Sequence, residues 1–386
     1  YQWQKNIEKY KLRITSGTTN EKVNANSDLF SGKNYKINNS LYTQLDKKWN
    51  RLNISLGARY EIFRLHSEDK YFIDGDSIND ISAEKPVFRT GINYQLAEAT
   101  YLRASWGQGY RFPSMAELFI RTTQSGLEIY PNPNLKPESG WSSEIGIKQG
   151  LKFGNWMGYI DVAAFIQQYD DMMEFSFGPW AENQGEANFY GLGFKSLNVG
   201  KTQISGIELS VNGQGKISKD FIVNFMGGYS YMHSISLTPD ETYAILERPI
   251  NLGGESIDSL TYNNNSSNPS VLKYRYKHIA KIDVEMIYKK ISLGGGFRFN
   301  DFMKNVDKIF TEDVIGGDNG MIPGINAARE KFKDGDFIID LRAGYQMTKT
   351  ARLGLIVNNL LNREYMSRPA NMMMPRTFAM QLALKI

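Results

Sequence analysis

Eight arginine and aromatic residues lie in polar stretches of the chain and could together bind an anion. They are Tyr110, Arg111, Phe112, Arg121, Tyr130, Trp180, Tyr365 and Arg368. Guanidinium groups bind oxyanions through paired hydrogen bonds, and aromatic faces pack against flat ligands and attract cations. This combination predicts a site for an anionic chelate of the catecholate or hydroxamate type. Ordinary packing of the polar stretches is the alternative interpretation.

Other residue types that bind metals or catalyse reactions are sparse. The chain has no Cys and only three His, at His66, His233 and His278. Thioethers in Met172–Met173 and Met372–Met374 are soft ligands that suit Cu(I), although Met also fills gaps in packing. We find no nucleophile–base pair and no zinc-binding set. The sequence therefore predicts neither an enzyme nor an intrinsic metal or cofactor.

The scaffold for these residues is predicted by a regular alternation of apolar and polar side chains. In Leu52–Ile62 the even positions are all apolar, or Tyr, and the odd positions are polar or Gly; Ala280–Tyr288 and Phe337–Tyr345 alternate in the same way. Successive side chains of a strand point to opposite faces, and strands of about ten residues suit a tilted bilayer crossing. Because a Lys or Arg facing lipid costs about 2–4 kcal/mol, a charge-free face is expected there. We predict an all-β fold, a transmembrane antiparallel β-barrel.

The opposite, polar face of these strands carries full charges. We expect them to line the lumen and to pair with each other or with a plug. The set comprises Arg59, Glu61, Asp161, Glu208, Lys281, Asp283, Glu285, Asp340 and Arg342.

About fourteen strands are predicted, joined alternately by short turns and long loops. The strands lie near 5–16, 37–46, 51–65, 86–96, 98–109, 140–150, 155–175, 195–213, 219–233, 273–289, 291–303, 336–347, 350–360 and 376–386. The long loops lie near 17–36, 66–85, 110–139, 176–194, 234–272, 304–335 and 361–375, with a short helix expected at Ala327–Phe332. Short turns on one side and long loops on the other are typical of outer-membrane barrels.

The composition agrees with such a barrel. The 386 residues include 35 Gly, 22 Tyr and 21 Phe, and no stretch of 18 or more apolar residues occurs. Trp106, Trp141 and Trp156 fall at predicted strand ends, the level at which indoles favour a membrane interface. The net charge of +4 is mild. No nucleic-acid partner is expected.

Several segments, in their order and spacing, resemble the TonB-dependent receptors. They are Gly107-Gln-Gly-Tyr-Arg-Phe-Pro-Ser-Met-Ala-Glu-Leu-Phe119, Asn132-Pro-Asn-Leu-Lys-Pro-Glu138, Glu144-Ile-Gly-Ile147, Gly206-Ile-Glu-Leu209, Asn358-Asn-Leu-Leu-Asn-Arg-Glu-Tyr365 and Pro375-Arg-Thr-Phe378. The resemblance covers about residues 98–386. It implies a 22-stranded barrel around an N-terminal plug, in the outer membrane of a Gram-negative bacterium. It also implies contact with lipopolysaccharide and import of a scarce ligand, usually an iron chelate, energised by an inner-membrane complex.

Counting strands back from Ile386 makes the first predicted strand about the ninth of such a barrel. We therefore expect residues 1–386 to form the C-terminal two-thirds of a larger barrel. The plug, its energy-coupling box and about eight strands are expected outside this sequence.

The favoured function is import of a ferric siderophore, with iron present only as part of the bound chelate. Other cargoes stay open, namely haem, copper, a vitamin or an oligosaccharide. Similar boxes in haem receptors of this family flank a His, but none lies between Tyr110 and Asn134. A barrel subunit of an envelope assembly and a passive fourteen-stranded porin are further alternatives.

Overall fold

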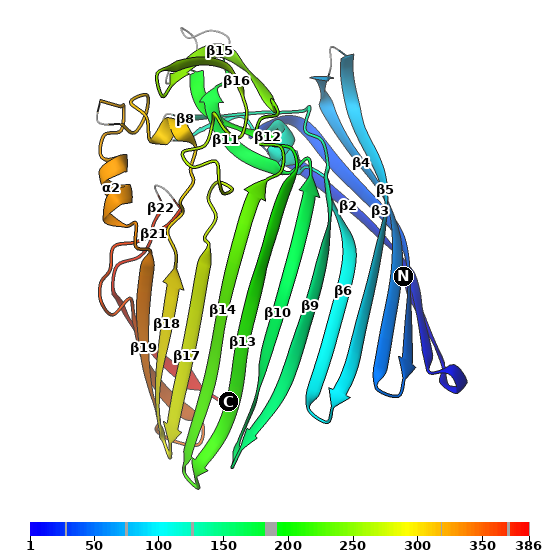
Figure 1. Ribbon diagram of the computed structural model, residues 1–386, viewed down its shortest axis with the longest axis vertical. Coiled ribbons are helices and arrows are strands. Elements are labelled where there is room, and N and C mark those ends of the chain that lie inside the picture. The colour runs from blue at the N-terminus through cyan, green and yellow to red at the C-terminus, as the bar shows by residue number, and fades with distance from the viewer. Residues whose placement is uncertain are drawn as a thin grey trace.

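In the computed structural model the chain forms a tall, curved antiparallel wall with a layer of loops over one end (Figure 1). The structure describes residues 1–27, 29–73, 76–124, 127–181, 191–317, 319–368 and 371–385. The wall is a sheet of 15 strands in the order β1-β2-β3-β4-β5-β6-β9-β10-β13-β14-β17-β18-β19-β20-β23. The predicted all-β antiparallel fold is confirmed.

The strands of the wall are long and follow one another along the chain. They are β1 Gln2–Ile7, β2 Leu12–Ser27, β3 Phe30–Trp49, β4 Leu52–Ile73, β5 Asp76–Ala97, β6 Thr100–Arg111, β9 Glu138–Phe153, β10 Trp156–Asp170, β13 Thr202–Ser218, β14 Phe221–Ser236, β17 His278–Tyr288, β18 Ile291–Asn300, β19 Asp336–Gln346, β20 Ala351–Asn358 and β23 Thr377–Leu384. Within the described residues β1 and β23 each pair on one side only, which leaves the wall open.

The expected short turns join β3–β4, β5–β6, β9–β10, β13–β14, β17–β18 and β19–β20, and all of these lie at one end of the wall. At the opposite end β2 and β3, and β4 and β5, also follow each other closely, since β2 ends at Ser27 and β3 begins at Phe30, and β4 ends at Ile73 and β5 begins at Asp76.

Asn50 and Gly154 occupy two of the expected short turns with φ of 45° and 59°. This left-handed conformation suits tight strand reversals, and Asn and Gly adopt it most readily. The turn around Lys289 has φ of 52° and joins β17 to β18 in the same way. We refer to the end with the expected short turns as the turn end and to the opposite end as the loop end.

The first part of the wall differs from the prediction. The strand expected at 5–16 is a hairpin, because the 3-10 turn Glu8–Tyr10 separates β1 from β2. The loops expected at 17–36 and 66–85 are wrong, because β2 through β5 continue through them with paired backbones. Polar runs such as Thr18–Lys22 interrupt the alternation in the sequence of these extensions, although the hydrogen-bond ladder continues.

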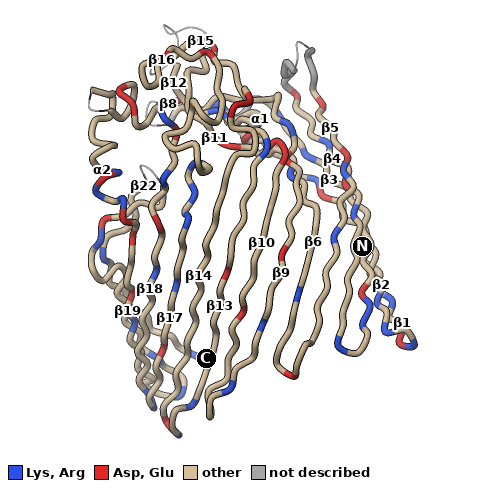
Figure 2. The backbone as a smooth tube through the Cα atoms, in the orientation of Figure 1, with Lys and Arg blue, Asp and Glu red and all other residues tan. Residues whose placement is uncertain are grey.

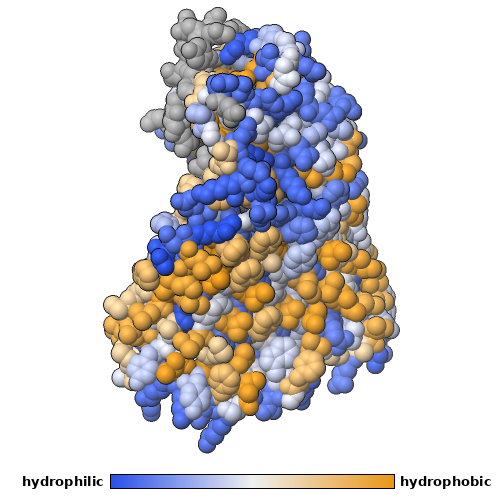
Figure 3. Space-filling model, turned by 60° about the vertical axis from the view of Figure 1, so that its left-hand side comes forward, coloured by the Kyte–Doolittle hydropathy of each residue, from blue (hydrophilic) through white to orange (hydrophobic). Residues whose placement is uncertain are grey.

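The outward face of the wall carries an exposed apolar band nearest the turn end (Figure 3). Leu56, Ile92 and Leu293 are among its members, each between 44% and 52% exposed. Large apolar side chains left open over so wide a surface indicate an apolar surrounding. The band is what the sequence alternation predicts for the lipid-facing side of a transmembrane barrel.

Charged residues occur along the strands as well as at the turns and loops (Figure 2), and several at inward positions pair with one another. Arg342 donates two hydrogen bonds of 2.6 Å to Asp283. Arg103 bridges Glu144 at 2.7 Å and Asp161 at 2.6 Å. The expected pairing is thus confirmed for most of the predicted lumen charges, which also form the ion pairs Arg59–Glu61, Arg298–Asp340 and Arg352–Glu285. Within the described residues Glu208 and Lys281 form no ion pair.

The loop end has small elements of its own. A four-stranded sheet contains β11 Met173–Pro179, β12 Leu192–Asn198, β8 Leu127–Tyr130 and β7 Thr122–Gln124. The other elements are β15 Ala244–Leu252, β16 Glu255–Leu260, β21 Met366–Arg368, β22 Asn371–Met372, α1 Met115–Phe119, α2 Ile325–Lys331 and a 3-10 turn, Lys308–Phe310. Helix α2 confirms the short helix expected at Ala327–Phe332. None of the helices in the described ranges is long and apolar enough to cross a membrane.

The apolar band gives a direct stability test. Leu56→Arg should lower the unfolding free energy of the full-length protein in a bilayer by about 2–4 kcal/mol, because it places a charge among lipid chains. Gly91→Arg is the matched control: Gly91 lies opposite Ser55 on the inward face, and a Cβ there meets nothing within 4 Å. Denaturant titration of protein folded into vesicles measures both changes. Equal losses of unfolding free energy in the two variants would contradict the assignment of Leu56 to the outward face and of Gly91 to the inward face.

Candidate ligand-binding site

A cavity of about 630 Å³ lies at the loop end of the wall, across β6, β9 and β10. Its lining combines cations, amides, aromatic rings and thioethers. The residues are Arg89, Gly107, Gln108, Gly109, Tyr110, Arg111, Glu138, Ser139, Gly140, Trp141, Ser142, Gln167, Tyr169, Met172, Met173, Ile204 and Arg275. Such a mixture of apolar surface and a few polar groups is typical of small-molecule sites.

The wall of the cavity follows from the strand register. Gly107 lies directly opposite Arg89 on one side and Ser142 on the other, and Ser142 lies opposite Gln167. Residues opposite one another in an antiparallel ladder share a face, so this row faces the lumen together. Gly109, two residues along β6, shares that face, and a Cβ there would meet nothing within 4 Å. Small residues in this row leave the space open.

Three arginines approach the cavity, and they differ in pairing. Arg111 is held by two carboxylates, since it donates to Glu117 at 2.8 Å and also to Glu138. Arg89 and Arg275 have no ion pair or hydrogen bond within the described residues. Unpaired guanidinium groups beside a cavity are available to an oxyanion.

Aromatic and sulfur groups complete the lining. The Tyr169 hydroxyl donates to Gln167 at 3.0 Å, and the Tyr110 hydroxyl is buried with no partner among the described residues. Met172 accepts a hydrogen bond of 3.0 Å from Thr202, and Met173 packs against an apolar cluster. Both methionines are therefore engaged in packing.

The apolar cluster beside the cavity includes Phe112, one of the predicted binding residues. Phe112 stacks on the buried Phe63 with ring centroids 3.6 Å apart. Leu118 and Phe119 of α1 and Leu135 complete this cluster. Helix α1 begins with a capping box, in which Ser114 and Glu117 satisfy each other's backbone N–H groups. The helix is thereby fixed over the end of β6.

Three other predicted residues lie in or next to the four-stranded sheet of the loop end: Tyr130 ends β8, Arg121 precedes β7 and Trp180 follows β11. Tyr130 and Trp180 lie in its core at 6% and 5% exposure, with Lys195 over the Trp180 ring. Burial and then Glu128 raise the pKa of Tyr130 to about 12. Arg121 is exposed, 3.8 Å from Glu128. None of the three lines the cavity.

The last two predicted residues follow β20. Tyr365 is buried at 8% exposure, and its carbonyl accepts a hydrogen bond from the Met373 N–H. Arg368 ends β21, paired with Asn371, and its side chain lies outside the described part of the structure. Of the eight predicted residues, only Tyr110 and Arg111 line the cavity. Ligand contact by any of the eight stays a prediction.

The prediction did not single out Arg89, Gln167, Tyr169 and Arg275. The alternation could have indicated Arg89, which shares the inward parity of its strand with Gly91 and Asn93. Arg275 falls on the polar parity of the strand predicted at 273–289, but β17 begins only at His278, and Arg275 reaches the cavity from the irregular segment before it. The three His residues line neither cavity described here, and the described residues hold no group of three or more metal-ligating His, Asp or Glu.

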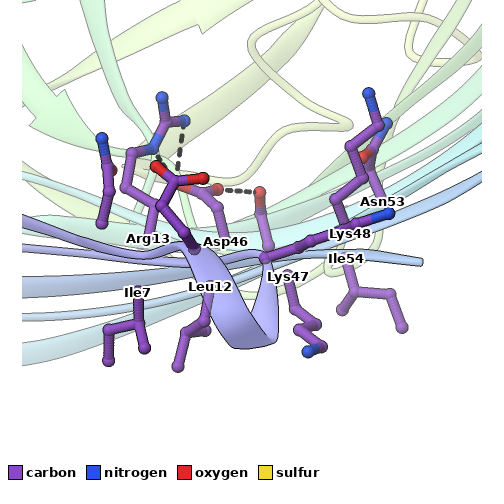
Figure 4. Close-up of a pocket in the computed structure, with 12 residues that line it drawn as sticks. Ile7, Leu12, Arg13, Asp46, Lys47, Lys48, Asn53 and Ile54 are labelled. Carbon is purple, nitrogen blue, oxygen red and sulfur yellow. Dashed lines mark hydrogen bonds and ion pairs between the residues drawn. The ribbon is translucent and has the colours of Figure 1, made fainter. Parts of the chain in front are cut away.

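A second cavity, of about 500 Å³, lies at the turn end beside β1 (Figure 4). There Ile7, Leu12 and Ile54 point to one side and Arg13 and Asp46 to the other. Arg13 donates to Asp46 at 3.0 Å, and Ser55 also donates to that carboxylate. Because these polar groups already bind one another, the cavity at the loop end is the better candidate for a ligand.

The Phe63–Phe112 stack yields a stability prediction. Phe63→Ala should cost about 3–5 kcal/mol, because it removes a buried ring from the cluster that holds α1 against the wall. Phe63→Leu keeps most of that volume and should cost about 1.5 kcal/mol or less. Denaturant unfolding and limited proteolysis of residues 112–137 measure the two variants. Equal protease resistance in both would argue against the role of the stack.

Comparisons with known proteins agree with this architecture. The family described as "TonB dependent receptor-like, beta-barrel" matches residues 1–360. A hemin receptor of Yersinia enterocolitica is 26% identical over 183 residues, which are 42% of this chain and 24% of that protein. The solved hemophore receptor HasR of Serratia marcescens has a TM-score of 0.66 and 16% identity over 99% of this chain and 57% of its own.

A third similar structure is the ferric enterobactin receptor PfeA of Pseudomonas aeruginosa. Its TM-score is 0.58 at 13% identity, over 100% of this chain and 53% of PfeA. At such identities the two solved structures show a shared fold and nothing of cargo. This chain spans a little over half the length of these two structures, and the matched segment is about a quarter of the hemin receptor.

Proposed function

The chain belongs to the TonB-dependent receptors, as part of their β-barrel, and on that basis we propose that it serves in the uptake of a ferric siderophore. Barrels of this family are outer-membrane transport receptors of Gram-negative bacteria. The proposed location is therefore the outer membrane, with lipopolysaccharide around the apolar band. Energy is proposed to come from an inner-membrane complex acting through a plug domain outside residues 1–386.

This proposal rests on Arg89 and Arg275, two arginines that line the cavity and have no ion pair or hydrogen bond within the described residues. An anionic chelate presents several oxygens, and a guanidinium group can bind two of them at once. The Tyr169 ring and Met173 offer flat or soft surface for the organic part of the ligand. Iron is then cargo, bound by its chelate, and the protein supplies charge and shape.

Haem is a second candidate cargo, favoured by the relative named a hemin receptor. The two carboxylates of haem could pair with Arg89 and Arg275. His is absent from the cavity lining, so any ligand to the iron would be an oxygen or sulfur atom, and the hydroxyls of Tyr110 and Tyr169 are among the oxygen atoms there. A copper cargo has less support, because Met172 and Met173 are already packed or hydrogen bonded.

The proposed function is tested by uptake in the source bacterium under iron limitation. Strains with and without the gene receive labelled ferric catecholates, ferric hydroxamates or hemin. Loss of uptake of one ferric chelate, restored by the gene, is the expected result. Loss of hemin uptake alone would replace the siderophore with haem. Unchanged uptake of all three would contradict iron transport and favour another cargo or a docking role in an envelope assembly.

The cavity is tested by substitution in the full-length receptor. Arg89→Gln and Arg275→Gln should each weaken binding of the transported chelate about tenfold or more, because hydrogen bonds to charged groups contribute about 1.5–3 kcal/mol. Gly109→Leu should also weaken binding, by filling space that no neighbouring atom occupies.

Arg121→Gln is the matched control, an exposed arginine outside the cavity that should leave affinity unchanged. Equilibrium titration followed by tryptophan fluorescence measures all four variants. A loss in Arg121→Gln without loss at Arg89 and Arg275 would move the site to the outer loops.

A further inference from the structure

Three charged residues are buried together in the loops beside the cavity. Lys273 and Asp307 are fully buried, with 2.7 Å between Nζ and Oδ1, and Glu174 is 8% exposed, 3.8 Å from the same Nζ. They come from three different connections of the wall, β10–β13, β14–β17 and β18–β19. We call Glu174, Lys273 and Asp307 the charge clasp.

The two carboxylates of the charge clasp are not equivalent. Asp307 also accepts hydrogen bonds from Tyr274 at 2.6 Å and Asn265 at 3.1 Å. Neither oxygen of Glu174 has a hydrogen bond of good geometry among the described residues. Asp307 is therefore the hydrogen-bonded partner of Lys273, whereas Glu174 is the carboxyl without such donors.

With all three groups ionised, the charge clasp would carry a buried net charge of −1. A buried charge without a full partner is costly, and a carboxyl in that position takes up a proton instead. Burial raises the pKa of Glu174, an effect that Lys273 and Arg275 offset only in part. Burial opposes the charge on Lys273, but Asp307 outweighs it and holds the pKa of Lys273 well above its usual value. Glu174 is therefore the group that titrates.

The charge clasp is connected to the cavity through short links. Met173, next to Glu174, lines the cavity, as does Arg275, two residues after Lys273. The Tyr262 hydroxyl accepts the Lys273 N–H at 2.7 Å, and the Tyr262 side chain packs in one cluster with Met172. The charged and titratable groups facing Glu174 are Lys273, Arg275, Asp307, Tyr262 and Tyr243.

We propose that Glu174 is a proton-linked positioning residue that decides whether Arg275 is available to the cavity. With Glu174 protonated, the charge clasp is neutral and Arg275 stays beside the cavity. With Glu174 ionised, the unpaired carboxylate draws Arg275 inward, and the segment 272–276 leaves the position described here. The proton on Glu174 exchanges with water, and no other bond changes. The proposal does not depend on which ligand the receptor carries.

The direction with pH follows from the raised pKa of Glu174. A carboxyl whose pKa is raised in the arrangement described here stabilises that arrangement at low pH, and the stabilisation is lost as pH rises through the raised pKa. This arrangement of the loops is thus favoured at lower pH and loosens as pH rises. A purely structural ion pair with ordinary carboxylate pKa values would not change across this range.

The test uses the full-length receptor in detergent micelles, without ligand. Hydrogen exchange of residues 171–174 and 272–276 is measured over a pH series that starts at about pH 5, above the ordinary carboxyl pKa of about 4.3, and rises from there; the rates are corrected for the intrinsic pH dependence of exchange. Protection in the wild type should be lost as pH rises, because ionisation of the buried Glu174 destabilises the arrangement described here. In Glu174→Gln, which is neutral at every pH, protection should stay at the low-pH level.

Glu128→Gln is the control, because Glu128 also lies 3.8 Å from a cation, Arg121, but its side chain is 18% exposed and that of Arg121 is 67% exposed. It should behave as the wild type. Wild-type protection that is independent of pH, or an unchanged pH response in Glu174→Gln, would overturn the proposal. Infrared difference spectra of the wild type give a second measurement should the variant fail to assemble. The band of a protonated carboxyl should disappear as pH rises. Spectra in which no such band is lost would equally overturn the proposal.

Discussion

Backbone hydrogen bonding between neighbouring strands is the interaction on which every other feature of this molecule depends. In the apolar surrounding that the exposed band indicates, an N–H or C=O group has only the next strand to bind. The chain meets this demand with antiparallel ladders that run through the whole wall, and β4 and β5 continue their pairing well past the band. The strict inward and outward alternation follows from the ladder, and with it the separation of a lipid-compatible face from a face that can hold charge.

The charged residues of the inward face fall into two groups. Along most of the wall its charges neutralise each other, as Arg342 does with Asp283 and Arg103 with Glu144 and Asp161. Near the loops the pattern changes, because Arg89 and Arg275 have no ion pair or hydrogen bond within the described residues and lie beside an open volume. Two such guanidinium groups at one cavity are the physical reason to propose an anionic ligand there.

The sequence predicted the fold better than the site. Alternation depends on neighbours one or two residues apart, so thirteen of the fourteen expected spans each overlap one strand of the wall, and the first is a hairpin instead. The spans expected at 155–175 and 195–213 also run into β11 and β12. The extensions of β2 through β5 escaped prediction because the regular alternation is lost in their sequence. The site depends on long-range folding of loops: Phe112, Tyr130 and Trp180 have suitable chemistry but pack into cores, whereas Arg275 reaches the cavity from an irregular segment. No local pattern distinguishes these outcomes.

The adjacency of Met173 and Glu174 on β11 has a consequence for how errors in folding would appear. Neighbouring strand residues face opposite ways, and β11 is aligned by its ladder to β12, in which Met173 lies opposite Asn198 and Pro179 opposite Leu192. A slip of one residue would exchange the two faces, bringing a carboxylate to the cavity and a thioether among the buried charges. The register of the seven-residue β11–β12 ladder therefore determines which side chains of β11 face the cavity. In the correct register the cavity surface attracts an anion, and in the shifted register it repels one.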